Sequence, residues 1–150
     1  MIRRLNRRKN IEIKIIAPLY INSYARELDN DIVSGVYIPR CPKTARLIKL
    51  FSQIASPWSI SRFSPDIVHE TYYSYKPLIS SKKVKTVITV YDMIHERFST
   101  FFPYGDKTHL IKKQAVKRAD HIICISETTK QDLIDILGID HSKISVIHLG

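Results

Sequence analysis

The sequence has 150 residues, of which 44% are hydrophobic and only 4 are glycine, and this suits one globular domain with a buried core. The formal net charge of +10 permits nucleic acid, an anionic membrane or a phosphorylated substrate as partner, because all three are negatively charged. No apolar run approaches the ~20 residues of a membrane-spanning helix, and the basic N-terminus lacks the apolar core of a signal peptide. We therefore expect a cytoplasmic protein.

Short β-branched segments alternate with longer helical patterns. We expect strands at residues 11–17, 66–69, 85–91, 121–126 and 144–149. Three of them contain continuously apolar runs, near residues 67, 87 and 122, which is typical of strands buried on both faces. Their order predicts an α/β fold with a doubly wound parallel sheet.

Helices are expected between these strands. Residues 44–54 have apolar residues at helical spacing, and Pro57 is expected to end or kink that helix. The helix after residue 126 has Ser126 as its cap and Gly138 as its end, and it completes a βαβ unit whose strands are parallel by right-handed crossover.

A further helix is expected over residues 106–119, with an apolar side and a basic side. The apolar side contains Leu110, Ile111, Ala115 and Ala119. The basic side contains Lys112, Lys113, Lys117 and Arg118. We predict that the basic side is solvated.

Polar residues at the carboxyl ends of the strands are the candidates for chemistry, because ligands of doubly wound sheets bind there. Asp92 follows the most apolar strand, where a carboxylate needs a cleft or a partner, and a capping role is an equal alternative. His95 has Asp92 and Glu96 as acidic neighbours, which could orient it for proton or hydroxyl recognition. The alternative is that His95 is a loop histidine whose hydrogen bonds are made within the protein and that contacts no ligand.

Other candidates for substrate contact follow other strands. Glu70, Thr71 and Tyr72 could bind a sugar, although hydrophobic cover over the sheet edge is the favoured interpretation of the nearby tyrosines. Ser126 and Glu127 suit a helix cap with an acid at the positive helix end, and any ligand role would be additional. The remaining candidates are Tyr91 and Gly150.

Several classes of site are disfavoured by the sequence. The two cysteines, Cys41 and Cys124, lack zinc-site spacing and are expected to be free thiols. The histidines show no i, i+4 pairing, and no glycine-rich phosphate loop or nucleic-acid-binding motif is present. We expect no metal site, no tightly bound cofactor and no nucleic-acid partner.

Three blocks resemble the family 4 glycosyltransferases. They read PDIVHETYY at 65–73, KTVITVYDMIHERF at 85–98 and KQAVKRADHIICISETTKQDLIDILGIDHSKISVIHLG at 113–150. The resemblance implies the GT-B architecture of two facing Rossmann-like domains, one for the acceptor and one for a nucleotide-diphosphate sugar, with retention and no essential metal. Residues 1–150 would be the acceptor-side domain without its first strand, and the donor domain would be absent.

The segment 89–92, Thr-Val-Tyr-Asp, is similar to a family pattern that usually reads Thr-x-His-Asp, so Tyr91 stands at the histidine position. The resemblance implies Asp92 as a catalytic residue, with His95 as a substitute for the missing polar contact to the sugar or the acceptor hydroxyl.

The function that the resemblance implies is hexosyl transfer, with mannose as one option, to a glycan or lipid-linked acceptor in polysaccharide or glycoconjugate synthesis. Expected partners are a separately encoded donor domain and, peripherally, the anionic inner face of the cell membrane. The chain alone is expected to be inactive, because transfer needs both substrates held between two domains. A non-catalytic binding or regulatory domain is the alternative, and a nucleic-acid-binding protein is a more distant one.

Overall fold

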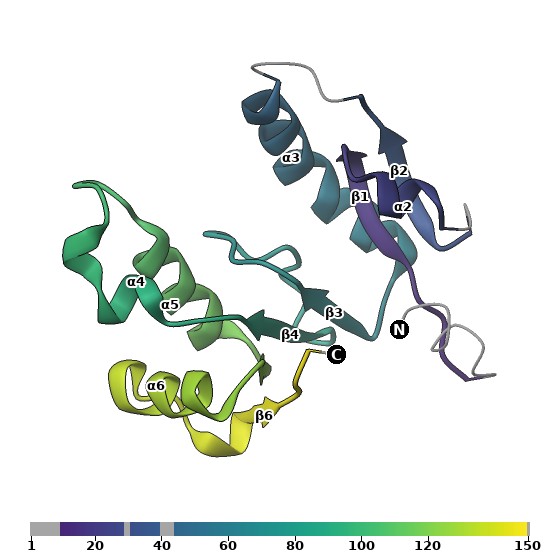
Figure 1. Ribbon diagram of the computed structural model, residues 1–150. Coiled ribbons are helices and arrows are strands. Elements are labelled where there is room, and N and C mark those ends of the chain that lie inside the picture. The colour runs from purple at the N-terminus through teal and green to yellow at the C-terminus, as the bar shows by residue number, and fades with distance from the viewer. Residues whose placement is uncertain (1–9, 29–30, 40–43, 150) are drawn as a thin grey trace. The chain divides into compact units, whose positions relative to one another are not determined.

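The computed structural model describes residues 10–28, 31–39 and 44–149, which fall into two compact units, Met1–Ser64 and Pro65–Gly150 (Figure 1). Each unit combines helices with a sheet, and every strand pair within the described residues is parallel. The α/β class and the parallel, Rossmann-like arrangement expected from the sequence are therefore confirmed.

The first unit contains a two-stranded sheet of β1 (Ile15–Tyr20) and β2 (Val33–Tyr37), with the short helix α2 (Ser23–Arg26) between them. β1 lies later in the chain than the predicted segment 11–17, and the sequence does not predict β2, whose pattern is interrupted by Gly35. At this glycine the strands approach so closely that an added Cβ would lie 1.7 Å from the Ala17 carbonyl oxygen. Gly35, which interrupts the strand pattern in the sequence, is therefore required for the close pairing of β2 with β1.

Helix α3 (Ala45–Phe63) follows and packs against β1. From the sequence, Pro57 is expected either to end or to kink this helix. The first alternative is wrong, because the helix continues past the proline to Phe63. A proline removes one backbone hydrogen bond, whereas the turns on either side keep theirs. Burial of Ile60 beyond the proline stabilises the continued helix.

The second unit contains a four-stranded sheet in the order β3-β4-β5-β6. Its strands are β3 (Ile67–Glu70), β4 (Lys85–Val90), β5 (His121–Cys124) and β6 (Ile144–Val146). Between β4 and β5 lie α4 (Ile94–Arg97), η1 (Ser99–Phe101) and α5 (Thr108–Arg118), and between β5 and β6 lie α6 (Glu127–Leu137) and η2 (His141–Lys143). The predicted βαβ unit of β5, α6 and β6 is confirmed.

One face of this sheet carries the core. Ile88 pairs with Ile122, which pairs with Ile144, and these side chains pack with Val116 of α5 and Leu133 of α6. The last three residues of β4 are buried, and buried residues alternate with partly buried ones in β5, whereas β3 alternates between buried and exposed residues. Ile67 of β3, an edge strand of the described four-stranded sheet, is exposed, so the prediction of burial on both faces is wrong there.

The ends of α6 agree with the sequence prediction. Ser126 Oγ accepts a hydrogen bond from the Thr129 N–H at 3.2 Å, and Gly138 ends the helix with a φ of 65°. A side chain with a Cβ is disfavoured in that left-handed conformation, which explains the glycine.

The buried face of helix α5 differs from the one predicted. Its buried stripe is Lys112, Ala115, Val116 and Ala119, while Leu110 is exposed. The expectation that Lys112 is solvated and Leu110 buried is therefore wrong. The spacing of 0, 3, 4 and 7 places these four residues on one helical face, and the lysine can join it because its stem is apolar and its ammonium finds partners.

Candidate functional site

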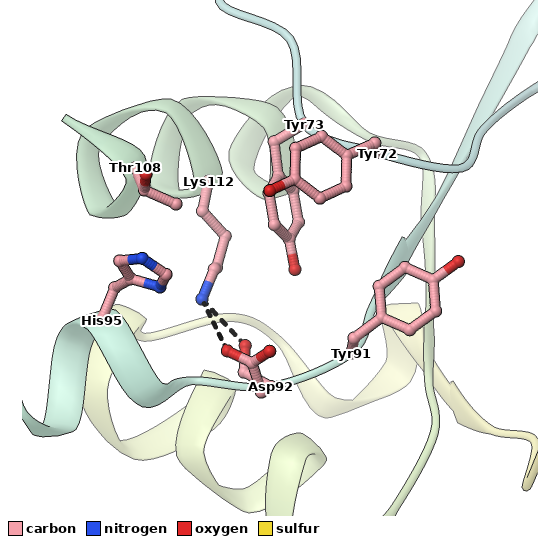
Figure 2. A pocket seen from close by; sticks show the side chains of 7 residues that line it. All are labelled: Tyr72, Tyr73, Tyr91, Asp92, His95, Thr108 and Lys112. Carbon is pink, nitrogen blue, oxygen red and sulfur yellow. Dashed lines mark hydrogen bonds and ion pairs between the residues drawn. The ribbon is translucent and has the colours of Figure 1, made fainter. Parts of the chain in front are cut away.

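A cavity of about 240 Å³ lies beyond the carboxyl ends of β3 and β4 (Figure 2). Its walls come from the segments after these strands and from α5. The lining residues are Tyr72, Tyr73, Tyr91, Asp92, His95, Thr108 and Lys112. Four of the sequence-derived candidates, Tyr72, Tyr91, Asp92 and His95, are thus brought together from two loops.

Lys112 is the central residue that sequence reasoning missed. Only 1% of its side chain is exposed, and Nζ donates to the Asp92 carbonyl oxygen at 2.8 Å and to Glu96 Oε2 at 2.7 Å. The ammonium also lies 5.4 Å from the centre of the Tyr73 ring, a cation–π distance. The lysine therefore fixes the segment after β4 to α5. Its position in the stripe with Ala115, Val116 and Ala119 is the signal that could have revealed it.

Asp92 has the capping role considered from the sequence, and its side chain also lines the cavity. Its Oδ1 accepts a hydrogen bond from the Ile94 N–H at 3.1 Å, which stabilises the start of α4, and lies 3.6 Å from Lys112 Nζ. The side chain is nevertheless 45% exposed at the cavity wall. A carboxylate held by a turn and a nearby cation, yet open to solvent, can accept a hydrogen bond from a ligand hydroxyl.

His95 has a different carboxylate partner from the one predicted. Its Nε2 lies 3.5 Å from Asp106 Oδ2 and its ring stacks on Phe102 at 4.0 Å, whereas Glu96 binds Lys112. Neighbouring helical residues point about 100° apart, which separates the two side chains. Hydrogen bonds from the Thr108 side chain and backbone hold the pKa of Asp106 below its usual range, so it faces the imidazole as an anion. His95 Nδ1 is buried without a partner among the described residues.

The tyrosines form the aromatic part of the cavity. The Tyr72 and Tyr73 rings lie 5.0 Å apart, and Tyr72 is largely exposed. Burial raises the pKa of Tyr73, which keeps its hydroxyl protonated, and the ring packs against the core. Tyr73 therefore acts as the hydrophobic cover favoured from the sequence, while Tyr72 and Tyr91 present ring surface to the cavity (Figure 2).

Glu70 does not line the cavity. Its carboxylate is buried and accepts from Arg118 at 2.7 Å and from the Ser74 hydroxyl at 2.9 Å. Arg118 also donates to the Ser74 carbonyl oxygen at 2.9 Å. These contacts tie the tyrosine segment to the end of α5, so the prediction that Arg118 belongs to a solvated face is wrong.

The remaining candidates lie outside the cavity wall. Thr71 and Glu127 are exposed, and Gly150 lies outside the described residues, as does Cys41. Ser126 acts as the cap of α6, and Thr129 beside it donates to the Tyr91 carbonyl oxygen at 3.4 Å. The start of α6 thereby supports the segment that carries Asp92.

The described ranges contain no candidate for a metal site or for a membrane-spanning helix. No group of three or more His, Cys, Asp or Glu residues in them is arranged to hold a metal ion. None of the helices in the same ranges has the length and apolar character needed to cross a bilayer.

Comparison with known proteins gives one family match. The model of the family described as Glycosyltransferase Family 4 matches residues 1–150. Among solved structures, the chain is similar to a glycosyltransferase from Rickettsia africae ESF-5, with 19% identity and a TM-score of 0.42. That match covers 86% of this chain and 33% of the other, so the chain spans about a third of that protein. No curated protein matches at a significant level.

Proposed function

The chain belongs to glycosyltransferase family 4, and from this premise we propose that residues 65–150 bind the acceptor in a sugar transfer from a nucleotide-diphosphate sugar. The observation that carries the proposal is the cavity beyond β3 and β4, where exposed tyrosine rings stand beside a partly exposed carboxylate and an imidazole. Aromatic rings suit the apolar face of a sugar, and polar groups around them suit its hydroxyls.

Asp92 and His95 have the leading roles in this proposal. Asp92 accepts a hydrogen bond from the acceptor hydroxyl, and its carboxylate is kept in place by the Ile94 N–H and by the nearby ammonium of Lys112. His95, held by Phe102 and Asp106, contacts the same hydroxyl or the transferred sugar. The acceptor is a glycan or a lipid-linked saccharide.

The donor half of the reaction is assigned to a second, GT-B-type domain. Positioning of both reactants and exclusion of water supply a large part of the rate in such transfers. We therefore propose that the chain alone neither hydrolyses nor transfers a nucleotide sugar. Release of nucleoside diphosphate by the purified chain would contradict this part of the proposal.

Acceptor binding is tested by titrating the chain with methyl α-mannopyranoside, methyl α-glucopyranoside and N-acetylglucosamine while amide NMR shifts are recorded. We expect saturable shifts around residues 91–95 with at least one of these sugars. Tyr72→Ala should remove them, because this exposed ring lines the cavity. Tyr75→Ala is the matched control, since Tyr75 is similarly exposed but lies outside the lining. Equal shifts in both variants, or none in the parent chain, would count against an acceptor site here.

A further inference from the structure

The cavity beyond β3 and β4 has an excess of negative charge, although the chain as a whole has a formal net charge of +10. Asp92 lines the cavity beside the ammonium of Lys112 (Figure 2), and the same ammonium pairs with Glu96. Two carboxylates thus share one cation, which leaves one negative charge without a counterion in this group. His95 does not supply it, because its imidazole faces a carboxylate of its own, Asp106, at 3.5 Å.

Asp92 is the carboxylate that is left without full compensation. Lys112 Nζ lies 2.7 Å from Glu96 Oε2 but 3.6 Å from Asp92 Oδ1. Glu96 is buried, where Coulomb attraction is stronger than in water, and its other oxygen has no partner among the described residues. The ammonium is therefore held by Glu96 and, being almost fully buried, does not reach a ligand. Among the lining residues, the carboxylate of Asp92 is thus the permanent charge that a ligand meets.

We propose that this uncompensated carboxylate makes the cavity selective by charge, with Asp92 as the specificity-determining residue. The sugar ring that the cavity prefers carries an amino group, whose ammonium pairs with Asp92, and a neutral ring binds less tightly. A uronate or phosphate group on that ring is disfavoured, because it would bring a second negative charge close to the carboxylate. The inference rests on the proposed acceptor site and narrows its ligand to a class of sugars defined by charge.

The aromatic residues of the cavity act in the same direction. The face of a tyrosine ring attracts cations, and Tyr73 already has the Lys112 ammonium 5.4 Å from its ring centre. Tyr72 and Tyr91 also line the cavity, and both rings are exposed, so they are available to the ammonium of a ligand. A carboxylate or phosphate gains nothing from these ring faces. The remaining polar group, the Thr108 hydroxyl, can bond to sugar hydroxyls of any of these ligands.

Charge selectivity is tested with four sugars that share one ring: methyl α-glucopyranoside, its 2-amino and 6-amino analogues, and the corresponding methyl glucuronide. The amide NMR shifts of residues 91–95 in the full chain give the dissociation constants, at about pH 6.5, where amines are protonated. At low salt we expect at least one amino sugar to bind about fivefold more tightly than the neutral sugar, as for a partly exposed ion pair. The glucuronide should bind about fivefold more weakly. Salt at about 0.5 M should remove most of both differences.

Asp92→Asn assigns the effect to one side chain. Asparagine removes the charge but keeps an oxygen that can accept from the Ile94 N–H. The affinity ratio between the amino sugar and the neutral sugar should fall to about one, and the penalty on the glucuronide should disappear. Asp66→Asn is the matched control, because Asp66 is exposed and precedes β3, at the opposite end of the strand from the cavity. This variant should keep both ratios of the parent chain.

Several results would overturn the inference. These are equal affinities for all four sugars in the parent chain, a preference for the amino sugar that high salt leaves unchanged, or a preference that persists in Asp92→Asn. If Asp92→Asn does not fold, its amide spectrum shows this, and the salt titration of the parent chain decides. Equal binding of all four sugars would remove the charge selectivity and leave the proposed acceptor site intact, whereas no shifts with any of them would overturn both.

Discussion

Replacement of Lys112 by methionine tests whether the segment carrying Asp92 depends on a buried ammonium. Methionine keeps an unbranched apolar stem but removes the charge and the donors. Two hydrogen bonds are lost, the 2.8 Å bond to the Asp92 carbonyl oxygen and the 2.7 Å bond to the Glu96 carboxylate, together with the longer contacts to Asp92 Oδ1 and the Tyr73 ring. Glu96 is itself 5% exposed, so its carboxylate would be left in a site with little water.

The expected cost follows from these two losses. Removing one partner of a buried ion pair costs about 3–5 kcal/mol, because the other charge stays buried without compensation. The lost hydrogen bond to a carbonyl oxygen adds about 1 kcal/mol. Together these are a large share of the ~5–15 kcal/mol that stabilises an ordinary domain. We therefore expect a marked fall in the free energy of unfolding.

Urea unfolding followed by circular dichroism measures this change, and hydrogen exchange at the β4 amides shows whether it is in the second unit. Lys113→Met is the matched control, since the neighbouring lysine is exposed and its loss should cost at most ~0.5 kcal/mol. Lys112→Met combined with Glu96→Met should recover most of the loss, because apolar residues can replace a buried pair. A cost below about 1 kcal/mol for Lys112→Met alone would refute the reasoning.

Two further predictions concern single ionisable groups. Hydrogen bonds from the Thr86 backbone, then from Lys85 and the Thr86 side chain, lower the pKa of Asp120 to about 2. Its stabilisation is therefore present above pH ~4, near the unfolded value, and is lost as the pH falls toward 2. Asp120→Asn should therefore lower the melting temperature at pH 7 but not at pH 2. Because the Asp120 side chain is partly exposed, the loss in free energy of unfolding at pH 7 should be about 1 kcal/mol. An equal effect on the melting temperature at both pH values would contradict this prediction. Burial raises the pKa of Cys124 to about 11, so the peptide containing it should resist iodoacetamide at pH 8 until denaturant is added, and rapid native labelling by mass spectrometry would disprove its burial.

Local chemistry alone determined a large part of this fold. Ser126 and Gly138 mark the ends of α6 because a hydroxyl cap and a left-handed glycine act within one turn of the chain. The apolar runs in β4 and β5 and the helix between β5 and β6 similarly predict parallel pairing, which requires a crossover of such length. Asp92 and His95 could be selected because a carboxylate and an imidazole after a buried strand are unusual in any fold.

Tertiary structure decided which side of α5 is buried and which charges have partners. Arg118 and Glu70 are 48 residues apart in sequence, and Lys112 and Glu96 are 16 apart, so no local pattern places them together. A helix with apolar residues on more than one side can rotate toward either, and the partners available at the sheet edge select the orientation. Here the carboxylate of Glu96 and the carbonyl oxygen of Asp92 stabilise a buried Lys112, and this leaves Leu110 facing solvent.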